Sequence, residues 1–226
     1  MSELNFDDPL TGGGDASGTR GTFHKPGKIV CIGRNYREHA KELGNEVPVE
    51  PLFFLKPSTS IIHNGESIRL PRQSERVEYE GEIGIVIGSR LTRASESEAI
   101  AAVRGIIALN DVTARDLQKK DSQWTRAKGF DTFCPIGEMA EGTFDLGNLV
   151  VITRVNGEER QRGNTSEMVF GIPMLLSYVS HVMTLEPGDI VATGTPAGVA
   201  PLQAGDVVEV EVEGLSKVSN RVEASH

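Results

Sequence analysis

The chain has 226 residues, 38% of them hydrophobic and 24% charged, which is the composition of a protein that buries a core. Its 32 acidic and 23 basic residues give a net charge of −9, which argues against a nucleic-acid-binding protein, because such a protein needs a basic face. No stretch reaches membrane-spanning length and the N-terminus lacks the apolar run of a signal peptide, so we expect a cytoplasmic protein that does not bind membranes.

Residues 1–22 are expected to form a flexible arm ahead of a single domain that spans residues 23–226. The segment 10–21 reads LTGGGDASGTRG, which is too rich in glycine to hold a packed element. It is not a phosphate-binding loop, because no strand precedes it and no Gly-Lys-Ser/Thr follows. The two cysteines, Cys31 and Cys134, lie in no metal-ligand spacing and are expected to be buried and unpaired.

A short strand and a short helix are predicted to open the domain. The strand spans 28–33 and is apolar, and the helix spans 36–43. Asn35 is the predicted N-cap of this helix, because asparagine favours that position. Gly44 suits the left-handed conformation that often follows a last helical turn.

The rest of the domain is predicted to contain more strands than helices. Strands are expected over 52–55, 78–87, 105–109 and 149–155, and after the Gly-Asp pairs at 188–189 and 205–206. Helices are expected over 96–103, with Gly105 at its end, and over 173–183, which begins with proline. Because no regular strand–helix–strand alternation is present, the sequence favours a β-rich α+β domain.

Three glutamates alternate along residues 77–88, which read VEYEGEIGIVIG. In a strand, Glu78, Glu80 and Glu82 would share one face at a spacing of about 7 Å, where like charges repel. A divalent cation such as Mg²⁺, Mn²⁺ or Ca²⁺ would remove this repulsion. The pattern alone is not specific, because VEVEVE at 208–213 alternates in the same way and is predicted to be only a solvent-facing strand.

Polar residues elsewhere strengthen the metal hypothesis for the first set of glutamates. Asp111 follows a buried apolar strand, and Arg115 and Gln118 lie within about two helical turns of it. Lys128 is a cation that could neutralise a substrate or excess carboxylate charge. Each of these residues also has an ordinary structural interpretation, as a helix cap, an ion-pair partner or a surface lysine.

A second group of candidates lies on the first helix and near the C-terminus. His39 and Glu42 are three residues apart on one helical face, where a carboxylate can orient an imidazole as a general base, although an exposed ion pair has the same spacing. Arg34 and Asn35 lie just upstream and could meet an anionic substrate. Thr195, in the turn TGTPAG at 193–198, could bind a carboxylate or simply connect two strands.

Taken in chain order, these segments resemble the fumarylacetoacetate hydrolase superfamily from about residue 28 to residue 222. The matching segments are GRNY at 33–36 with His39 and Glu42, YEGE at 79–82, NDVTARDLQ at 110–118, AKGF at 127–130 and TGTPAG at 193–198. The resemblance implies a mixed β-roll or sandwich with short helices, usually a homodimer. It also implies Mg²⁺ or Mn²⁺ held by Glu80, Glu82 and Asp111.

The resemblance implies roles for the remaining candidates as well. It places His39 and Glu42 on a lid that orders when substrate binds. The residues that it directs toward the substrate are Arg115, Gln118, Lys128 and Thr195. Gly129 follows the lysine where relatives often have serine or alanine, which predicts a looser lysine contact.

Short members of the superfamily include acylpyruvases, oxaloacetate decarboxylases, fumarylpyruvate hydrolases and isomerase/decarboxylases of aromatic catabolism. We therefore expect metal-dependent hydrolysis of a carbon–carbon bond in a small 1,3-dicarbonyl acid of the acylpyruvate or fumarylpyruvate type, with His39, Glu42 and Lys128 as catalytic residues. Oxaloacetate decarboxylation or tautomerisation is the second expectation, and 2-hydroxyhepta-2,4-diene-1,7-dioate isomerisation the third. A catalytically silent metal-binding homologue is the alternative of a different class.

Overall fold

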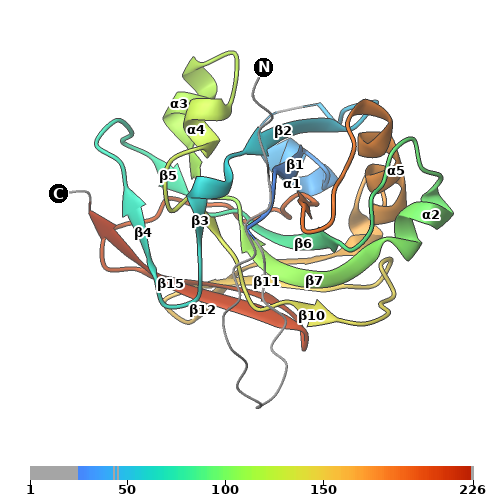
Figure 1. The fold of residues 1–226 in the computed structure, drawn as a ribbon. Coiled ribbons are helices and arrows are strands. Elements are labelled where there is room, and N and C mark those ends of the chain that lie inside the picture. The colour runs from blue at the N-terminus through green and yellow to red at the C-terminus, as the bar shows by residue number, and fades with distance from the viewer. Residues whose placement is uncertain (1–24, 43, 45, 225–226) are drawn as a thin grey trace, which may run out of the picture.

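The computed structural model describes residues 25–42, 44 and 46–224 and is drawn as a ribbon in Figure 1. The arm predicted over residues 1–22 lies outside this part, so the arm and the single domain at 23–226 stay predictions. Within the described residues, strands outnumber helices, and the longest helix has 11 residues. This confirms the predicted β-rich α+β class.

The larger of the two main sheets has six strands in the order β10-β7-β6-β13-β1-β2. Its strands in chain order are β1 (Ile29–Gly33), β2 (Leu52–Lys56), β6 (Gly81–Ile87), β7 (Val103–Asn110), β10 (Ala140–Glu141) and β13 (Ile190–Ala192). β1 and β13 run parallel, whereas the other neighbouring pairs are antiparallel. As a result, β1, β7 and β13 end at the edge of the sheet where β6 begins.

The second main sheet has five strands in the order β12-β11-β14-β15-β4. Its strands are β4 (Ser67–Leu70), β11 (Val150–Val155), β12 (Glu158–Asn164), β14 (Val207–Val212) and β15 (Ser216–Ala224). Strands β11, β14 and β15 contact β6 or β7, and Figure 1 shows the two sheets layered against each other. Two short ladders complete the strands, β3 (Ile61–Ile62) with β9 (Cys134–Pro135) and β5 (Val77–Glu78) with β8 (Thr113–Ala114).

In the described part of the chain, five short α-helices lie around the sheets. They are α1 (Arg37–Glu42), α2 (Glu96–Ala101), α3 (Arg115–Lys120), α4 (Thr125–Lys128) and α5 (Ile172–Val182), and two 3₁₀ turns span Ser58–Ser60 and Thr165–Glu167. Helices α2 and α5 pack together on one side of the molecule, and α3 and α4 pack together on the other (Figure 1). None of the helices in the described part of the chain combines the length and apolar character of a membrane-crossing helix.

The predicted strand over 78–87 is wrong in two respects. The strand breaks at residues 79–80, because Glu78 pairs with β8 whereas Gly81 and the residues after it pair with β7. In addition, β6 is buried on both faces: Ile85 packs in the cluster that includes α5, and Val86 packs in the cluster that includes Cys31. Burial on both faces explains why this strand is apolar throughout after Glu82.

The second run of alternating glutamates behaves as predicted. In β14, Val208, Val210 and Val212 are buried, whereas Glu209 and Glu211 are partly exposed and share an ion pair with Arg154. The valines face the sandwich core and the glutamates face the outside. The same sequence pattern therefore serves a structural purpose here.

Several local predictions can now be compared with the structure. The Asn156-Gly157 turn joins β11 to β12 with positive φ angles of 54° and 83°. Both cysteines are buried and free, as predicted. Gly105 does not end a helix but lies in β7. A Cβ atom there would lie 2.6 Å from the carbonyl oxygen of Ala140, so the close approach of β10 requires glycine.

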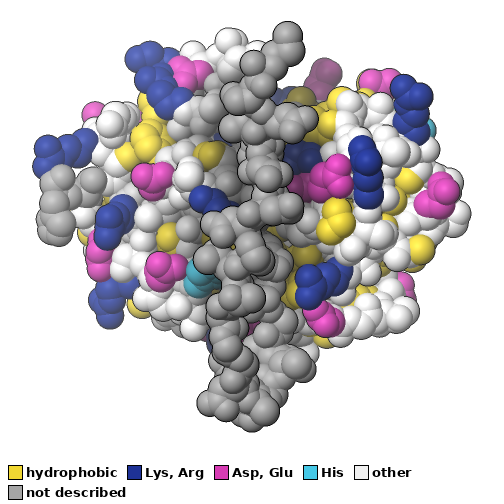
Figure 2. Space-filling view, viewed as in Figure 1, with side chains coloured by type: hydrophobic (Ala, Val, Ile, Leu, Met, Phe, Trp, Pro, Cys, Tyr) yellow, Lys and Arg dark blue, Asp and Glu magenta, His cyan; other side chains and the backbone are white. Residues whose placement is uncertain are grey.

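Charged side chains of both signs are interspersed over the described part of the face shown in Figure 2. Exposed charged side chains pair with one another at several places in the described chain, as Arg162 does with Glu159 at 2.9 Å. Exposed pairs of this kind add little stability, on the order of 0–1 kcal/mol. The buried charges described below are a different case.

Gly81, between the two site glutamates, is the residue whose replacement by alanine is expected to be least tolerated in β6. A Cβ atom there would lie 1.9 Å from Oγ1 of Thr153 on the opposing sheet. We expect Gly81→Ala to destabilise the protein by roughly 1–3 kcal/mol or more, because the sheets must move apart. Urea unfolding measures this change. Gly171→Ala is the control, because its nearest contact would be 3.9 Å away, and equal effects in both variants would contradict the prediction.

Candidate metal centre and adjoining pocket

The candidate site lies at the edge of the six-stranded sheet where β7 ends and β6 begins. The N–H group of Asp111 donates to the carbonyl oxygen of Glu80 at 2.8 Å. The N–H group of Glu80 in turn donates to Oδ1 of Asn110 at 3.0 Å. These bonds join the two strands at the point where both carry carboxylates, and so fix the position of one carboxylate relative to the other.

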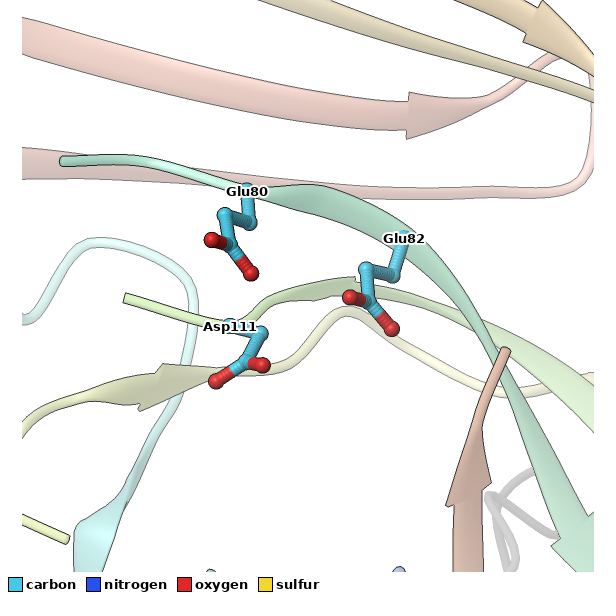
Figure 3. Close-up of side chains that lie close together, drawn as sticks. All are labelled: Glu80, Glu82 and Asp111. Atoms are coloured by element: carbon cyan, nitrogen blue, oxygen red, sulfur yellow. The ribbon is translucent and has the colours of Figure 1, made fainter. Parts of the chain in front are cut away.

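Glu80, Glu82 and Asp111 direct their carboxylates toward one another, as Figure 3 shows. Each offers one oxygen atom, and these oxygens lie within 4.8 Å of one another. All three residues are buried, with at most 5% of their surface exposed. Carboxylate oxygens are the ligands that Mg²⁺, Mn²⁺ and Ca²⁺ prefer. The structure thus brings the predicted ligands together.

The buried carboxylates of this cluster are not all paired with cations. Glu80 and Asp111 pair with the buried cations Arg115, Lys128 and Lys56, and the buried Glu78 pairs with Arg115 and with Arg76. Glu82 has no ion pair with any other described residue, and it accepts one hydrogen bond, from the N–H group of Gly194 at 2.8 Å. Burial and the neighbouring Asp111 and Glu80 raise its pKa. A divalent cation would supply the missing positive charge, so the residues present fit a metal.

Lys128 bridges two of the three carboxylates. Its Nζ atom lies 2.7 Å from Glu80 and 2.6 Å from Asp111. Burial favours the neutral form of Glu80, but Lys128 and Arg115 outweigh burial and hold its pKa below the usual value. For Lys128 itself, burial lowers the pKa but the two carboxylates outweigh it and raise the pKa, so the lysine keeps its proton.

Lys128 keeps close contacts with these two carboxylates although Gly129 follows it, and the expected looser contact with substrate stays a prediction. The glycine ends α4, where a Cβ atom would lie 2.6 Å from the carbonyl oxygen of Thr125. The tight turn at this position requires a residue without a side chain. The lysine is fixed by its ion pairs and not by the residue that follows it.

Lys56 is a site residue that the sequence interpretation missed. It ends β2, is 1% exposed, and its Nζ atom lies 2.6 Å from Oδ1 of Asp111 and 3.1 Å from the carbonyl oxygen of Val112. Because Lys128 binds the other oxygen, both oxygens of Asp111 have a lysine partner. The predicted strand stopped at residue 55, one position short of this lysine. A lysine that closes an apolar strand was the available signal.

Replacing Lys56 by methionine is expected to destabilise the metal-free protein by about 3 kcal/mol, because the buried carboxylate of Asp111 loses one of its two lysine partners. Urea unfolding in EDTA measures the change. Lys217→Met is the matched control, since its side chain is 55% exposed and pairs with Glu209 at the surface. We expect a change of less than about 1 kcal/mol there. Similar values for the two variants would contradict a role for Lys56 in supporting Asp111.

His39 and Glu42 form the pair predicted from their spacing. The Nδ1 atom of His39 lies 3.3 Å from Oε2 of Glu42, and His39 is 5% exposed. Burial lowers the pKa of His39, although Glu80 and Glu42 act in the opposite direction. The neutral ring is the form that accepts a proton, and with Nδ1–H donating to Glu42 its Nε2 atom is free to do so. Glu42 also accepts from the N–H group of Gly198, at 3.1 Å, which ties α1 to the 193–198 turn.

Arg115, Gln118 and Thr195 each have hydrogen-bond partners within the protein, and their contact with substrate stays a prediction. Arg115 donates to Glu78 and Glu80, and to Gln118 at 2.6 Å. The hydroxyl group of Thr195 donates to the carbonyl oxygen of Gly81 at 2.8 Å. These contacts connect α3 to Glu78 and Glu80, and the 193–198 turn to Gly81 at the start of β6.

Asn35 has a structural role that differs from its predicted one. Its amide group donates to the carbonyl oxygens of Thr193 at 2.8 Å and Phe170 at 3.1 Å, and its oxygen accepts from the N–H group of Phe170 at 2.9 Å. The N-cap prediction is therefore wrong, because the side-chain oxygen bonds a distant loop and not the helix. Asn35 is fully buried, and its contact with substrate stays a prediction.

A cavity of about 300 Å³ adjoins the carboxylates of Glu80 and Asp111. The predicted residues that line it are Arg34, His39, Glu80, Asp111, Arg115, Gln118, Lys128 and Thr195. Glu42, Glu82 and Asn35 do not line it, and Glu82 lies behind the other two carboxylates at 1% exposure. Phe54, Lys119 and Trp124 also line the cavity and were not predicted.

A mixed β-sandwich with three buried carboxylates beside a small cationic pocket defines the class of this protein. Residues 28–223 match the C-terminal domain of fumarylacetoacetate hydrolase, and the chain belongs to the fumarylacetoacetate hydrolase family. Oxaloacetate tautomerase FAHD1 of Arabidopsis thaliana is 44% identical over 207 residues, which cover 89% of this chain and 93% of that protein. The predicted family is thereby confirmed.

Two solved structures extend the comparison. The 2-hydroxyhepta-2,4-diene-1,7-dioate isomerase from Mycobacterium marinum is 42% identical with a TM-score of 0.82, over 89% of this chain and 76% of that one. The fumarylpyruvate hydrolase from Pseudomonas aeruginosa, in complex with Mn²⁺ and pyruvate, is 30% identical with a TM-score of 0.86, over 92% of this chain and 94% of that one. The predicted fold is confirmed by these similarities.

Proposed function

We propose that this chain is a divalent-metal-dependent enzyme that acts on a small 2-oxo acid with a second carbonyl or carboxyl group at C4. The observation that carries the proposal is that His39, held by Glu42, lines the same cavity as Glu80 and Asp111. A neutral imidazole beside a cation site can remove a proton from such an acid or from a water molecule that attacks it. The family and the named activities of the relatives support this substrate class.

Glu80, Glu82 and Asp111 would hold the metal, which when bound would supply Lewis-acid charge to the substrate oxygens. Mg²⁺ or Mn²⁺ is our proposal, and the Mn²⁺ of the Pseudomonas hydrolase supports it. Lys128 contributes a second positive charge in the same cavity. Its raised pKa keeps it protonated and able to stabilise an anion.

Hydrolysis of an acylpyruvate is the first candidate reaction. His39 takes a proton from water through Nε2, and the water oxygen attacks the C4 carbonyl group. The C3–C4 bond then breaks with its electron pair leaving on C3, which gives a carboxylic acid and the enolate of pyruvate, and the proton returns to C3. Glu42 keeps the imidazole oriented during both transfers, and Lys128 stabilises the enolate charge.

Oxaloacetate tautomerisation or decarboxylation is the second candidate. It is favoured by the 44% identity to a named oxaloacetate tautomerase, against 30% to the hydrolase. Tautomerisation needs only the transfer of a proton between C3 and the C2 oxygen, and decarboxylation breaks the C3–C4 bond without water. The 42% identity to an isomerase keeps diene isomerisation as a third candidate, since it uses proton transfer as well.

An assay of two substrates with magnesium or with EDTA separates these candidates. The protein is incubated with acetylpyruvate and with oxaloacetate, while pyruvate formation and enol absorbance are followed. Magnesium-dependent pyruvate from acetylpyruvate would support hydrolysis. Pyruvate or altered enol absorbance from oxaloacetate alone would support the second candidate. No magnesium-dependent change with either substrate would contradict both.

We also propose that the protein forms a homodimer. The edge strand β2 supports this, because its apolar residues Leu52 and Leu55 are 36% and 43% exposed. Light scattering should give twice the chain mass of 24.4 kDa. A mass equal to one chain at micromolar concentration would contradict the proposal.

A further inference from the structure

We propose that Arg34 and Lys119 form a second anion-binding subsite in this pocket, which selects substrates with two carboxylates over those with one. The ligand class is a 2-oxo acid with a further carboxylate at its far end. The inference rests on the proposed function, because it assumes that the 2-oxo acid group lies at the metal end of the cavity. It is carried by the geometry of Arg34 and by the charges that line the pocket.

The backbone of Arg34 is held in a conformation that arginine rarely adopts. Its φ angle is 58°, in the left-handed region, where most non-glycine residues are strained. The next residue, Asn35, is clamped by its bonds to Thr193 and Phe170. Strain that the surroundings enforce is found most often at functional sites. Here it directs the arginine to the lining of the pocket.

Trp124 holds the guanidinium group of Arg34 in place. The guanidinium carbon lies 5.9 Å from the centre of the indole ring, within the range of a cation–π contact. The indole is itself fixed, because it packs edge-to-face against Phe54 and against the backbone of Gly33, where a Cβ atom would lie 3.1 Å from the ring. The arginine is thus pre-organised at the wall of the pocket and needs little ordering when a ligand binds.

The positive charges in the pocket fall into two groups. Arg115 and Lys128 are paired with the buried carboxylates. Arg34 and Lys119 form no ion pair or side-chain hydrogen bond with another residue of the described part, although both line the same cavity. Two cations without an ion-pair partner in the same cavity as the candidate metal ligands Glu80 and Asp111 fit a ligand that carries more than one negative charge. A substrate with one carboxylate would leave them unused.

The test compares two 2-oxo acids of equal chain length, 2-oxoglutarate and 2-oxopentanoate. In 2-oxopentanoate, a methyl group replaces the far carboxylate of 2-oxoglutarate. Calorimetric titration of the magnesium-loaded full chain gives both dissociation constants without turnover. We expect the dianion to bind at least about tenfold more tightly, the size of one or two charge-assisted hydrogen bonds. Arg34→Gln should weaken the binding of 2-oxoglutarate about tenfold and change the binding of 2-oxopentanoate by less than about twofold. Lys119→Gln should also weaken the binding of 2-oxoglutarate more than that of 2-oxopentanoate.

Arg93→Gln is the matched control. Arg93 also has a left-handed φ angle, of 50°, but it does not line the pocket, so neither affinity should change. Equal affinities of wild-type protein for the two acids would overturn the subsite and leave the proposed function standing. The subsite would also be overturned if Arg34→Gln weakened the binding of both acids equally and Lys119→Gln weakened neither. Loss of the packing of Arg34 on Trp124 would explain such a result without any contact to the far carboxylate. If neither acid binds the magnesium-loaded protein, the proposed function fails and the subsite with it.

Discussion

Replacing His39 by alanine is expected to lower kcat by about 10²- to 10⁴-fold, the usual contribution of a positioned acid–base group. The affinity for magnesium should change little, because the candidate ligands are the carboxylates of Glu80, Glu82 and Asp111. The ring of His39 lines the pocket and is held by Glu42 at 3.3 Å. Steady-state kinetics on the substrate that the first assay identifies gives kcat, and calorimetry gives metal affinity.

His181→Ala is the control for His39→Ala. His181 is exposed on α5 and its Nδ1 atom lies 2.9 Å from the carbonyl oxygen of Ser177, away from the pocket. Its replacement should leave kcat unchanged. Glu42→Gln should retain part of the activity of wild type, because glutamine can still accept a hydrogen bond from the ring. Turnover of His39→Ala equal to that of wild type would rule out the base role.

Replacing Glu82 by glutamine is expected to have opposite effects on metal binding and on the stability of the metal-free protein. The variant should lose most of the metal-induced stabilisation, which for a ligand at a hundred times its Kd is about 2.7 kcal/mol. Without metal, it should be more stable than wild type by about 1 kcal/mol or more, because a buried carboxylate near Asp111 and Glu80 is neutralised. The amide oxygen can still accept the hydrogen bond from Gly194.

The stability gain of Glu82→Gln should depend on pH in a defined direction. Burial and the neighbouring carboxylates raise the folded pKa of Glu82 above the ordinary glutamate value of 4.5, so the folded state favours the protonated form. At a pH below 4.5, Glu82 of the wild-type protein is protonated in both the folded and the unfolded state, and it then resembles glutamine. The wild-type and Glu82→Gln proteins should therefore be equally stable with respect to this residue. The stability gain of Glu82→Gln over wild type should grow as the pH rises from 4.5 to the folded pKa of Glu82, and it should stay constant above that pKa. Thermal unfolding in EDTA between acidic and neutral pH measures it.

Glu211→Gln is the matched control for Glu82→Gln. Glu211 belongs to the partly exposed glutamates of β14 and pairs with Arg154 at 2.7 Å. Its replacement should leave metal-induced stabilisation intact and lower stability slightly, if at all. A Glu82→Gln protein that magnesium stabilises as much as wild type would contradict the assignment of Glu82 as a ligand.

The fold could be predicted from the sequence where local patterns determine it. The Asn156-Gly157 turn, the two Gly-Asp turns and the proline at the start of α5 all lie where local conformational preferences place them. The break at residues 79–80 could not be predicted, because it depends on two different partner strands, β8 and β7. Gly105 was misassigned for the same reason, since its role is set by the approach of β10.

The candidate metal ligands could not be predicted from the alternating glutamate pattern alone. Alternating glutamates occur both at residues 78–82 and in β14, and only the tertiary position of Asp111 distinguishes a buried carboxylate cluster from an outer strand face. The family resemblance supplied this information, whereas the pattern did not. Lys56 and Trp124 were missed because each is brought to the site by a contact with a residue distant in sequence.

The central claim, that Glu80, Glu82 and Asp111 bind a divalent cation beside His39, is tested most directly by diffraction from crystals soaked in Mn²⁺. An anomalous difference map locates manganese independently of any assumption about the reaction. We predict one strong peak between the three carboxylates, at about 2.0–2.6 Å from their oxygens. Crystals of Glu82→Gln should lack it. A map of the wild-type protein without this peak, with Lys128 still bridging Glu80 and Asp111, would contradict the claim.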